Sequence, residues 1–243
     1  METKLNMNSS STIKKYVVVG FLLSVMWVIT SVQASAQEQQ LLYPAKAPLS
    51  QYLSPDKQSE IALARSAAPT SISGDADVMV LEADGYTTAI KGANGFVCIT
   101  ERSWANATDS PEFWNPKLRS PNCFNAAAAR SFLPIYLRKT KLVLAGKSKS
   151  DIAAAIAAGF DKKELPALEV GAMCYMMSKQ QYLNDEGRSW HPHLMFLIAG
   201  DAAKAWGANL PDSPIMAAVD PEERVTIFMV LTGTWSDGTP AMH

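Results

Sequence analysis

The hydrophobic pattern of this chain changes period twice, and this order restricts the fold more than any other sequence feature. Residues 78–100 form short apolar and β-branched runs separated by turn signals such as Asp84-Gly85. Residues 126–160 instead repeat apolar side chains every three or four positions, which is typical of helices. Residues 168–231 return to strand-like runs. Strands, then helices, then strands predict an α+β domain in which helices pack on one face of an antiparallel sheet.

Individual elements can be placed within this order. A strand meander comes first, a helical pair follows, and further strands complete the sheet. Asn125 can cap a helix that Pro134 kinks or splits, and Ile152, Ile156 and Phe160 give the second helix one buried stripe. The expected strands are residues 78–81, 86–91, 96–100, 168–177, 191–199, 215–219 and 224–231.

The first 36 residues have the organisation of a bacterial secretory signal peptide. A lysine-containing segment precedes an almost wholly apolar run at residues 16–32, and small side chains follow at residues 34–36. We therefore predict cleavage between Ala36 and Gln37 and a periplasmic or extracellular location. The alternative is an uncleaved anchor, because the apolar run is near the lower length limit for spanning a bilayer.

The remaining chain divides into two parts by composition. Residues 37–72 have no strong period and are interpreted as a linker plus a short helix, and residues 73–243 as a single domain. The formal net charge of −1 and the absence of a basic patch argue against nucleic acid as a partner. No second apolar run is long enough to span a membrane, so we expect no transmembrane segment after signal removal.

Three cysteines follow the signal peptide, at positions 98, 123 and 174. In an oxidising compartment an odd count suggests one bridge and one thiol. We favour a Cys98–Cys123 bridge, which would close a loop of about 25 residues; the alternative is three small buried apolar side chains. No two cysteines have C-x-x-C spacing, which argues against zinc-ribbon, thioredoxin-type and haem c sites.

The segment Trp190-His191-Pro192-His193 is the one compact cluster of catalytic or metal-ligating residue types. Residues two apart on a strand point the same way, so His191 and His193 could share a metal ion, with Cys174 as a candidate third ligand. The alternative is a structural pair that hydrogen-bonds to backbone or water. No cofactor is predicted, and a divalent metal at this pair is the one candidate.

A long segment at residues 102–122 is rich in aromatic residues and proline, without clear periodicity. It is either an ordered cover for the sheet or an exposed surface for a cell-envelope partner. Arg102, Arg119 and Arg130 flank it and are candidates for binding a carboxylate or phosphate. Ion pairs with neighbouring acidic residues explain the three arginines equally well.

Three short strings together resemble a group of uncharacterised secreted bacterial proteins. These are Asn94-Gly95-Phe96-Val97-Cys98, Pro121-Asn122-Cys123 and Pro192-His193-Leu194-Met195, within residues 75–232. The group has an Asn-Gly-aromatic-x-Cys strand and a later Pro-His-hydrophobic-Met segment, and no activity is attached to it. The resemblance favours the Cys98–Cys123 pairing and implies that His193 matters more than His191.

The sequence alone therefore leads to an exported protein that acts as a binding or accessory domain. Its partner, a small molecule or an envelope protein, is not specified by any motif. The alternative is a hydrolase-type or metal-dependent enzyme that uses His193 as general base or ligand, with His191 or Cys174. An enzyme should place His193 in a pocket beside a carboxylate or thiol, whereas a structural histidine should be buried against backbone partners.

Overall fold

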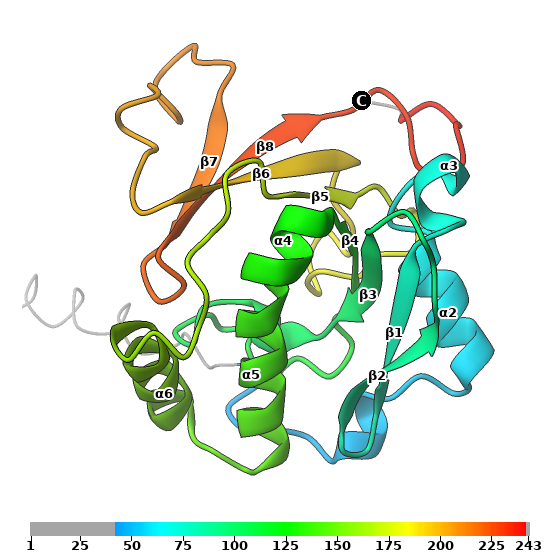
Figure 1. Cartoon of the computed structure of the whole chain (residues 1–243), viewed down its shortest axis with the longest axis vertical. Coiled ribbons are helices and arrows are strands. Elements are labelled where there is room, and N and C mark those ends of the chain that lie inside the picture. The colour runs from blue at the N-terminus through cyan, green and yellow to red at the C-terminus, as the bar shows by residue number, and fades with distance from the viewer. Residues whose placement is uncertain (1–41, 242–243) are drawn as a thin grey trace, which may run out of the picture. The chain divides into compact units, whose positions relative to one another are not determined.

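The computed structural model describes residues 42–241, which contain one mixed sheet and several helices (Figure 1). The sheet order is β2-β1-β3-β4-β5-β6-β8-β7, and every neighbouring pair is antiparallel except β1 and β3. The α+β class is thus confirmed. The strands are β1 (Asp77–Glu82), β2 (Gly85–Ile90), β3 (Val97–Glu101), β4 (Ser120–Phe124), β5 (Met173–Met176), β6 (His193–Ala199), β7 (Met216–Asp220) and β8 (Val225–Leu231).

The first three strands differ from the expected meander. The predicted β1–β2 hairpin forms, with Ala83 and Asp84 in its turn and Gly85 at the start of β2, but β3 pairs with β1, in parallel, rather than with β2. The reason lies in the connection after β2. The Gly92 N–H donates to the Asp77 carboxylate, and a Cβ at Gly92 would lie 2.1 Å from the backbone oxygen of Asp75. This close approach holds the connection beside the start of β1, so β3 enters alongside that strand.

Side-chain caps mark the starts of two of the longer helices. The Asp56 side chain caps α2 (Lys57–Arg65) by accepting a hydrogen bond from the Ser59 N–H at 2.8 Å. A capping box between Ser148 and Asp151 starts α6 (Lys149–Asp161). The expected split near Pro134 separates α4 (Ala126–Ser131) from α5 (Leu133–Leu144). The shorter helices are α3 (Thr70–Ser73), η1 (Leu49–Gln51) and η2 (Ser103–Ala105).

Helices cover both faces of the sheet rather than the single face expected. Neighbouring residues of β3 show this directly. Cys98 packs in a cluster with Ile61 and Ala64 of α2, whereas Ile99 belongs to the main core with Tyr136 of α5. We call the face under α4 and α5 the main face; Figure 1 shows these two helices end to end across it. On the opposite face, α2 packs through Ile61 and Ala64.

Residues 42–72 belong to the same compact unit as the rest of the described chain. Tyr52 is buried in the main core, and its hydroxyl donates to the Trp114 backbone oxygen at 2.9 Å. The stretch interpreted from sequence as a linker plus a short helix therefore packs against the sheet domain. Residues 1–36, with the expected signal peptide, lie outside the described residues.

The long aromatic segment is an ordered cover and not an exposed surface. Trp104, Phe113 and Trp114 are all buried, and the Trp104 indole N–H donates to the Thr140 hydroxyl at 2.9 Å. The segment also ends earlier than expected, because residues 120–124 form β4 beside β3. Pro121 masked this strand in the sequence, since proline cannot donate to a ladder; β4 pairs with β5 only beyond it, at Cys123 and Phe124.

Candidate functional site

The predicted Cys98–Cys123 disulfide is confirmed. The two residues face each other across the β3–β4 ladder, and both are fully buried beneath α2. Cys174 is the free cysteine, and it is buried on the main face of β5. Burial raises the pKa of its thiol well above the ordinary value, with the nearby Glu101 carboxyl adding to the effect. Cys174 is therefore protonated at neutral pH and poorly suited to act as a nucleophile or metal ligand.

His193 begins β6 and is buried, with 2% of its surface exposed. Its Nδ1 lies 2.7 Å from the His191 backbone oxygen, and its ring packs 4.7 Å from that of Trp190. No carboxylate of residues 42–241 hydrogen-bonds to it. Within that range no three or more His, Cys, Asp or Glu side chains are arranged to hold a metal ion. The expected metal set of His191, His193 and Cys174 is therefore not assembled in the described chain.

The burial of His193 predicts that the stability of the protein depends on pH. Burial lowers the pKa of its imidazole, so the native state resists a proton that the unfolded chain accepts below about pH 6.5. The free energy of unfolding should therefore fall as the pH drops through this value. The variant His193→Asn, whose amide can donate to the same backbone oxygen, should show a smaller fall. Urea unfolding of both proteins at about pH 7.5 and about pH 5.5 checks this; equal falls would contradict it.

The three candidate anion-binding arginines do not meet at one pocket. Arg102 is fully buried and forms a two-pronged ion pair with Glu60, at 2.8 and 2.9 Å. Arg119 donates to the backbone oxygens of nearby loop residues, and burial lowers the pKa of its guanidinium to about 10. Arg130 forms an exposed ion pair with Glu169 at 2.6 Å. Internal partners thus account for the charge or hydrogen bonds of all three.

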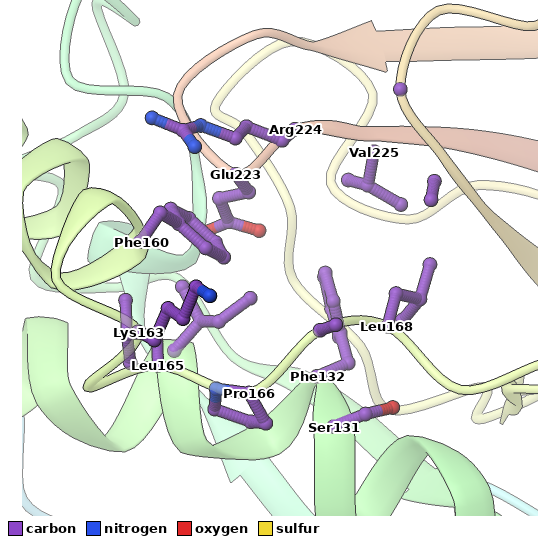
Figure 2. A pocket seen from close by; sticks show the side chains of 14 residues that line it. Ser131, Phe132, Phe160, Lys163, Leu165, Pro166, Leu168, Glu223, Arg224 and Val225 are labelled. Carbon is purple, nitrogen blue, oxygen red and sulfur yellow. The ribbon is translucent and has the colours of Figure 1, made fainter.

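A cavity that none of these arginines lines is shown in Figure 2, and we call it the outer pocket. It has a volume of about 620 Å³ and lies between the α4–α5 junction, the segment after α6, the end of β6 and the start of β8. Its walls are mainly apolar. The larger apolar side chains in them are Phe132, Ile135, Phe160, Leu165, Leu168 and Val225.

Two cationic side chains, Lys163 and Arg224, lie at one side of the outer pocket, as Figure 2 shows. Both residues have positive φ, of 59° and 55°, in the turns that follow α6 and precede β8. Arg224 packs over the Phe160 ring, 5.0 Å from its centre, and forms an ion pair with Asp161 at 2.6 Å. The Lys163 ammonium has no hydrogen bond or ion pair with any described residue, so it is available to a ligand.

A second, smaller cavity adjoins the outer pocket, and we call it the inner chamber. It has a volume of about 240 Å³, and Phe132 and Glu223 line both spaces. Alternate residues of β4 line it from the main face of the sheet, namely Ser120, Asn122 and Phe124. Glu101 of β3 and Tyr136 of α5 also line it.

In the inner chamber, one buried carboxylate has an ion-pair partner and another carboxyl group has none in the described chain. Lys139 forms a buried ion pair with Glu223 at 2.8 Å and also donates to the Asn106 backbone oxygen at 3.0 Å. Among residues 42–241, Glu101 has no ion-pair partner, and its carboxyl accepts a hydrogen bond only from the Asn122 amide. Burial raises the pKa of the Glu101 carboxyl to about 8, so it is largely protonated at neutral pH.

Neither cavity was anticipated from the sequence. Comparison with known proteins found no family model, no curated protein and no solved structure that matches this chain. The described residues contain no helix long and apolar enough to cross a membrane. The function must therefore be inferred from the geometry of the two cavities.

Proposed function

We propose that this protein is an exported binding protein for a small amphipathic molecule that has an apolar body and an anionic head. The observation that carries the proposal is the outer pocket, whose apolar walls end at a pair of cationic side chains. Pockets of about 300–1,000 Å³ with apolar walls and few polar groups are typical of small-molecule sites, and this one is within that range.

The apolar walls determine what the body of the ligand can be. Phe132, Phe160 and Leu165 would remove an alkyl chain or an apolar ring system from water, at about 25 cal/mol per Å² of apolar surface. Glu223 is the one buried acidic residue in the walls, and its carboxylate is already paired with Lys139. An apolar body therefore meets no unpaired buried charge.

The two cations at the side of the pocket favour an anionic head. Lys163 is exposed, and its ammonium has no partner in the described chain. Arg224 has one exposed partner, Asp161, which a ligand carboxylate could replace at small cost because surface ion pairs are weak. A carboxylate placed between Lys163 and Arg224 would remain hydrated while its apolar body is buried.

Export supports a role in collecting or carrying such a molecule outside the cytoplasm. The disulfide indicates an oxidising compartment. The expected signal peptide at residues 1–36, with cleavage before Gln37, supplies the route and is part of the proposal. The resemblance to secreted bacterial proteins points the same way.

Ligands that differ only in the head group test the proposal. We expect the purified protein to bind dodecanoate below its micellar concentration, with a weaker affinity for dodecanol and the weakest for dodecyltrimethylammonium, by titration calorimetry. The variant Lys163→Gln should weaken dodecanoate binding by about two- to five-fold, because an exposed charge pair contributes about 0.4–1 kcal/mol.

Two further variants separate the contributions of head and body. Lys162→Gln, one residue away and outside the pocket walls, should leave the dodecanoate affinity unchanged. Phe160→Ala should weaken all three ligands, because it removes an apolar wall. Equal affinity for the three head groups, or no binding of dodecanoate by the native protein, would contradict the proposal.

A further inference from the structure

The inner chamber holds two buried polar groups whose hydrogen bonds are incomplete. Asn122 is 1% exposed; its amide N–H donates to Glu101 and to the Ser120 hydroxyl, but its Oδ1 has no partner. Glu101 is 7% exposed, and among residues 42–241 its carboxyl accepts a hydrogen bond only from the Asn122 amide. Buried acceptors are rarely left without a donor, so this pattern indicates a ligand with N–H or O–H groups.

The charges around the chamber favour a positively charged ligand. Lys139 is the cation that acts on Glu101 within the described chain, and its ammonium is already bonded to Glu223 and to the Asn106 backbone oxygen. Asp220 also lines the chamber, and it is half-buried. When Glu101 ionises, the acidic groups of the chamber therefore outnumber its cations, and no described side chain supplies the missing positive charge.

The remaining walls favour an organic cation over a bare metal ion. Phe124, Phe132, Tyr136, Met176, Met195 and Leu197 supply rings, thioethers and an alkyl side chain. In the described chain no three His, Cys, Asp or Glu side chains are arranged to bind a metal. Divalent metals such as Ca²⁺ need six or more oxygen ligands, whereas a short alkyl group fits against these walls.

We propose that the inner chamber binds a primary alkylammonium ion, whose N–H groups donate to the Glu101 carboxylate and to Oδ1 of Asn122, while its alkyl group packs between Tyr136 and the methionines. This site is distinct from the outer pocket, although Phe132 and Glu223 line both spaces. A quaternary ammonium has no N–H and would leave both acceptors unsatisfied. The primary amine is therefore the preferred class.

Binding of the cation should be coupled to release of one proton. Without ligand, Glu101 is held largely protonated at neutral pH, mainly by burial and further by the nearby Glu223 charge. The ammonium supplies the missing counter-ion, so the carboxyl proton leaves to solvent and the carboxylate–ammonium pair remains. The titratable groups around Glu101 are Glu223 and Asp220 from the β7–β8 region, Lys139 and Tyr136 of α5, Tyr86 of β2 and Cys174 of β5.

The experiment is a calorimetric titration of the protein with n-butylammonium at several pH values. Because the ligand binds the ionised carboxyl, the dissociation constant should fall about tenfold per pH unit up to about pH 8 and then level off. Titrations in phosphate and in Tris at about pH 7 should differ by the heat of about one proton released per ligand. Tetramethylammonium and n-butanol, which lack the N–H donors or the charge, should bind at least tenfold more weakly.

Two matched substitutions locate the site. Glu101→Gln keeps the size of the side chain and should weaken n-butylammonium binding by about tenfold or more and abolish proton release. Glu82→Gln, on an exposed β1 carboxylate, should change neither. Native-like thermal unfolding of Glu101→Gln confirms that the fold is intact. An affinity independent of pH, equal binding by Glu101→Gln or by tetramethylammonium, or no binding at all would overturn the proposal.

Discussion

Replacing Arg102 by methionine is expected to lower the free energy of unfolding by about 3–5 kcal/mol. Arg102 is fully buried, and its guanidinium donates to both oxygens of Glu60, to the Tyr52 backbone oxygen at 2.6 Å and to the Thr100 backbone oxygen. The substitution leaves Glu60, which is 2% exposed, with the Ser54 hydroxyl as its one remaining side-chain partner among residues 42–241. An uncompensated buried carboxylate accounts for the expected loss.

Urea unfolding followed by circular dichroism measures this effect, and Arg130→Met is the matched control. Arg130 forms its pair with Glu169 on the surface, so its loss should cost less than about 1 kcal/mol. The double variant Glu60→Leu/Arg102→Met should recover part of the stability, because it removes both buried charges together. If Arg102→Met and Arg130→Met lowered the free energy of unfolding by similar amounts, the buried ion pair would matter no more for stability than the exposed one, which contradicts the prediction.

Removing the Cys98–Cys123 disulfide should cost about 3.5 kcal/mol, the loop-closure entropy expected for a bridge across about 25 residues. The variant Cys98→Ala/Cys123→Ala tests this by urea unfolding. It retains the small apolar volume beneath α2, so the loss should come mainly from the unfolded chain.

The control is the same measurement with a reducing agent present throughout. Reductant should lower the stability of the native protein toward that of Cys98→Ala/Cys123→Ala and should leave the double variant unchanged. If the double variant were as stable as the oxidised native protein, the bridge would contribute nothing to folding.

Local patterns were sufficient to predict much of the fold. The turn signal at Asp84-Gly85 predicted the first hairpin, and the Asn125 cap and Pro134 predicted the helix boundaries, because these features act over a few residues. The parallel β1–β3 pairing could not be predicted the same way. It depends on the contact of Gly92 with the backbone at Asp75, across 17 positions of the chain and a full hairpin.

The candidate sites were harder to predict, because each combines residues from distant elements. The outer pocket joins Phe132, Phe160, Lys163 and Arg224, which no short motif connects. The inner chamber depends on the alternation of Ser120 and Asn122, which was hidden because Pro121 made β4 look like a loop. His193 was a candidate site residue because histidine is rare in this sequence, but in the structure it contacts the His191 backbone oxygen and the ring of Trp190.

Because Cys98 and Cys123 are buried, the rate at which their disulfide is reduced depends on how often the fold opens. Both side chains are inaccessible to solvent, enclosed between the central ladder and α2. A reductant such as a small thiol must touch a sulfur atom to exchange with it, so the native fold has to open first. The rate of disulfide reduction in mild reductant would then measure the frequency with which the centre of the sheet opens.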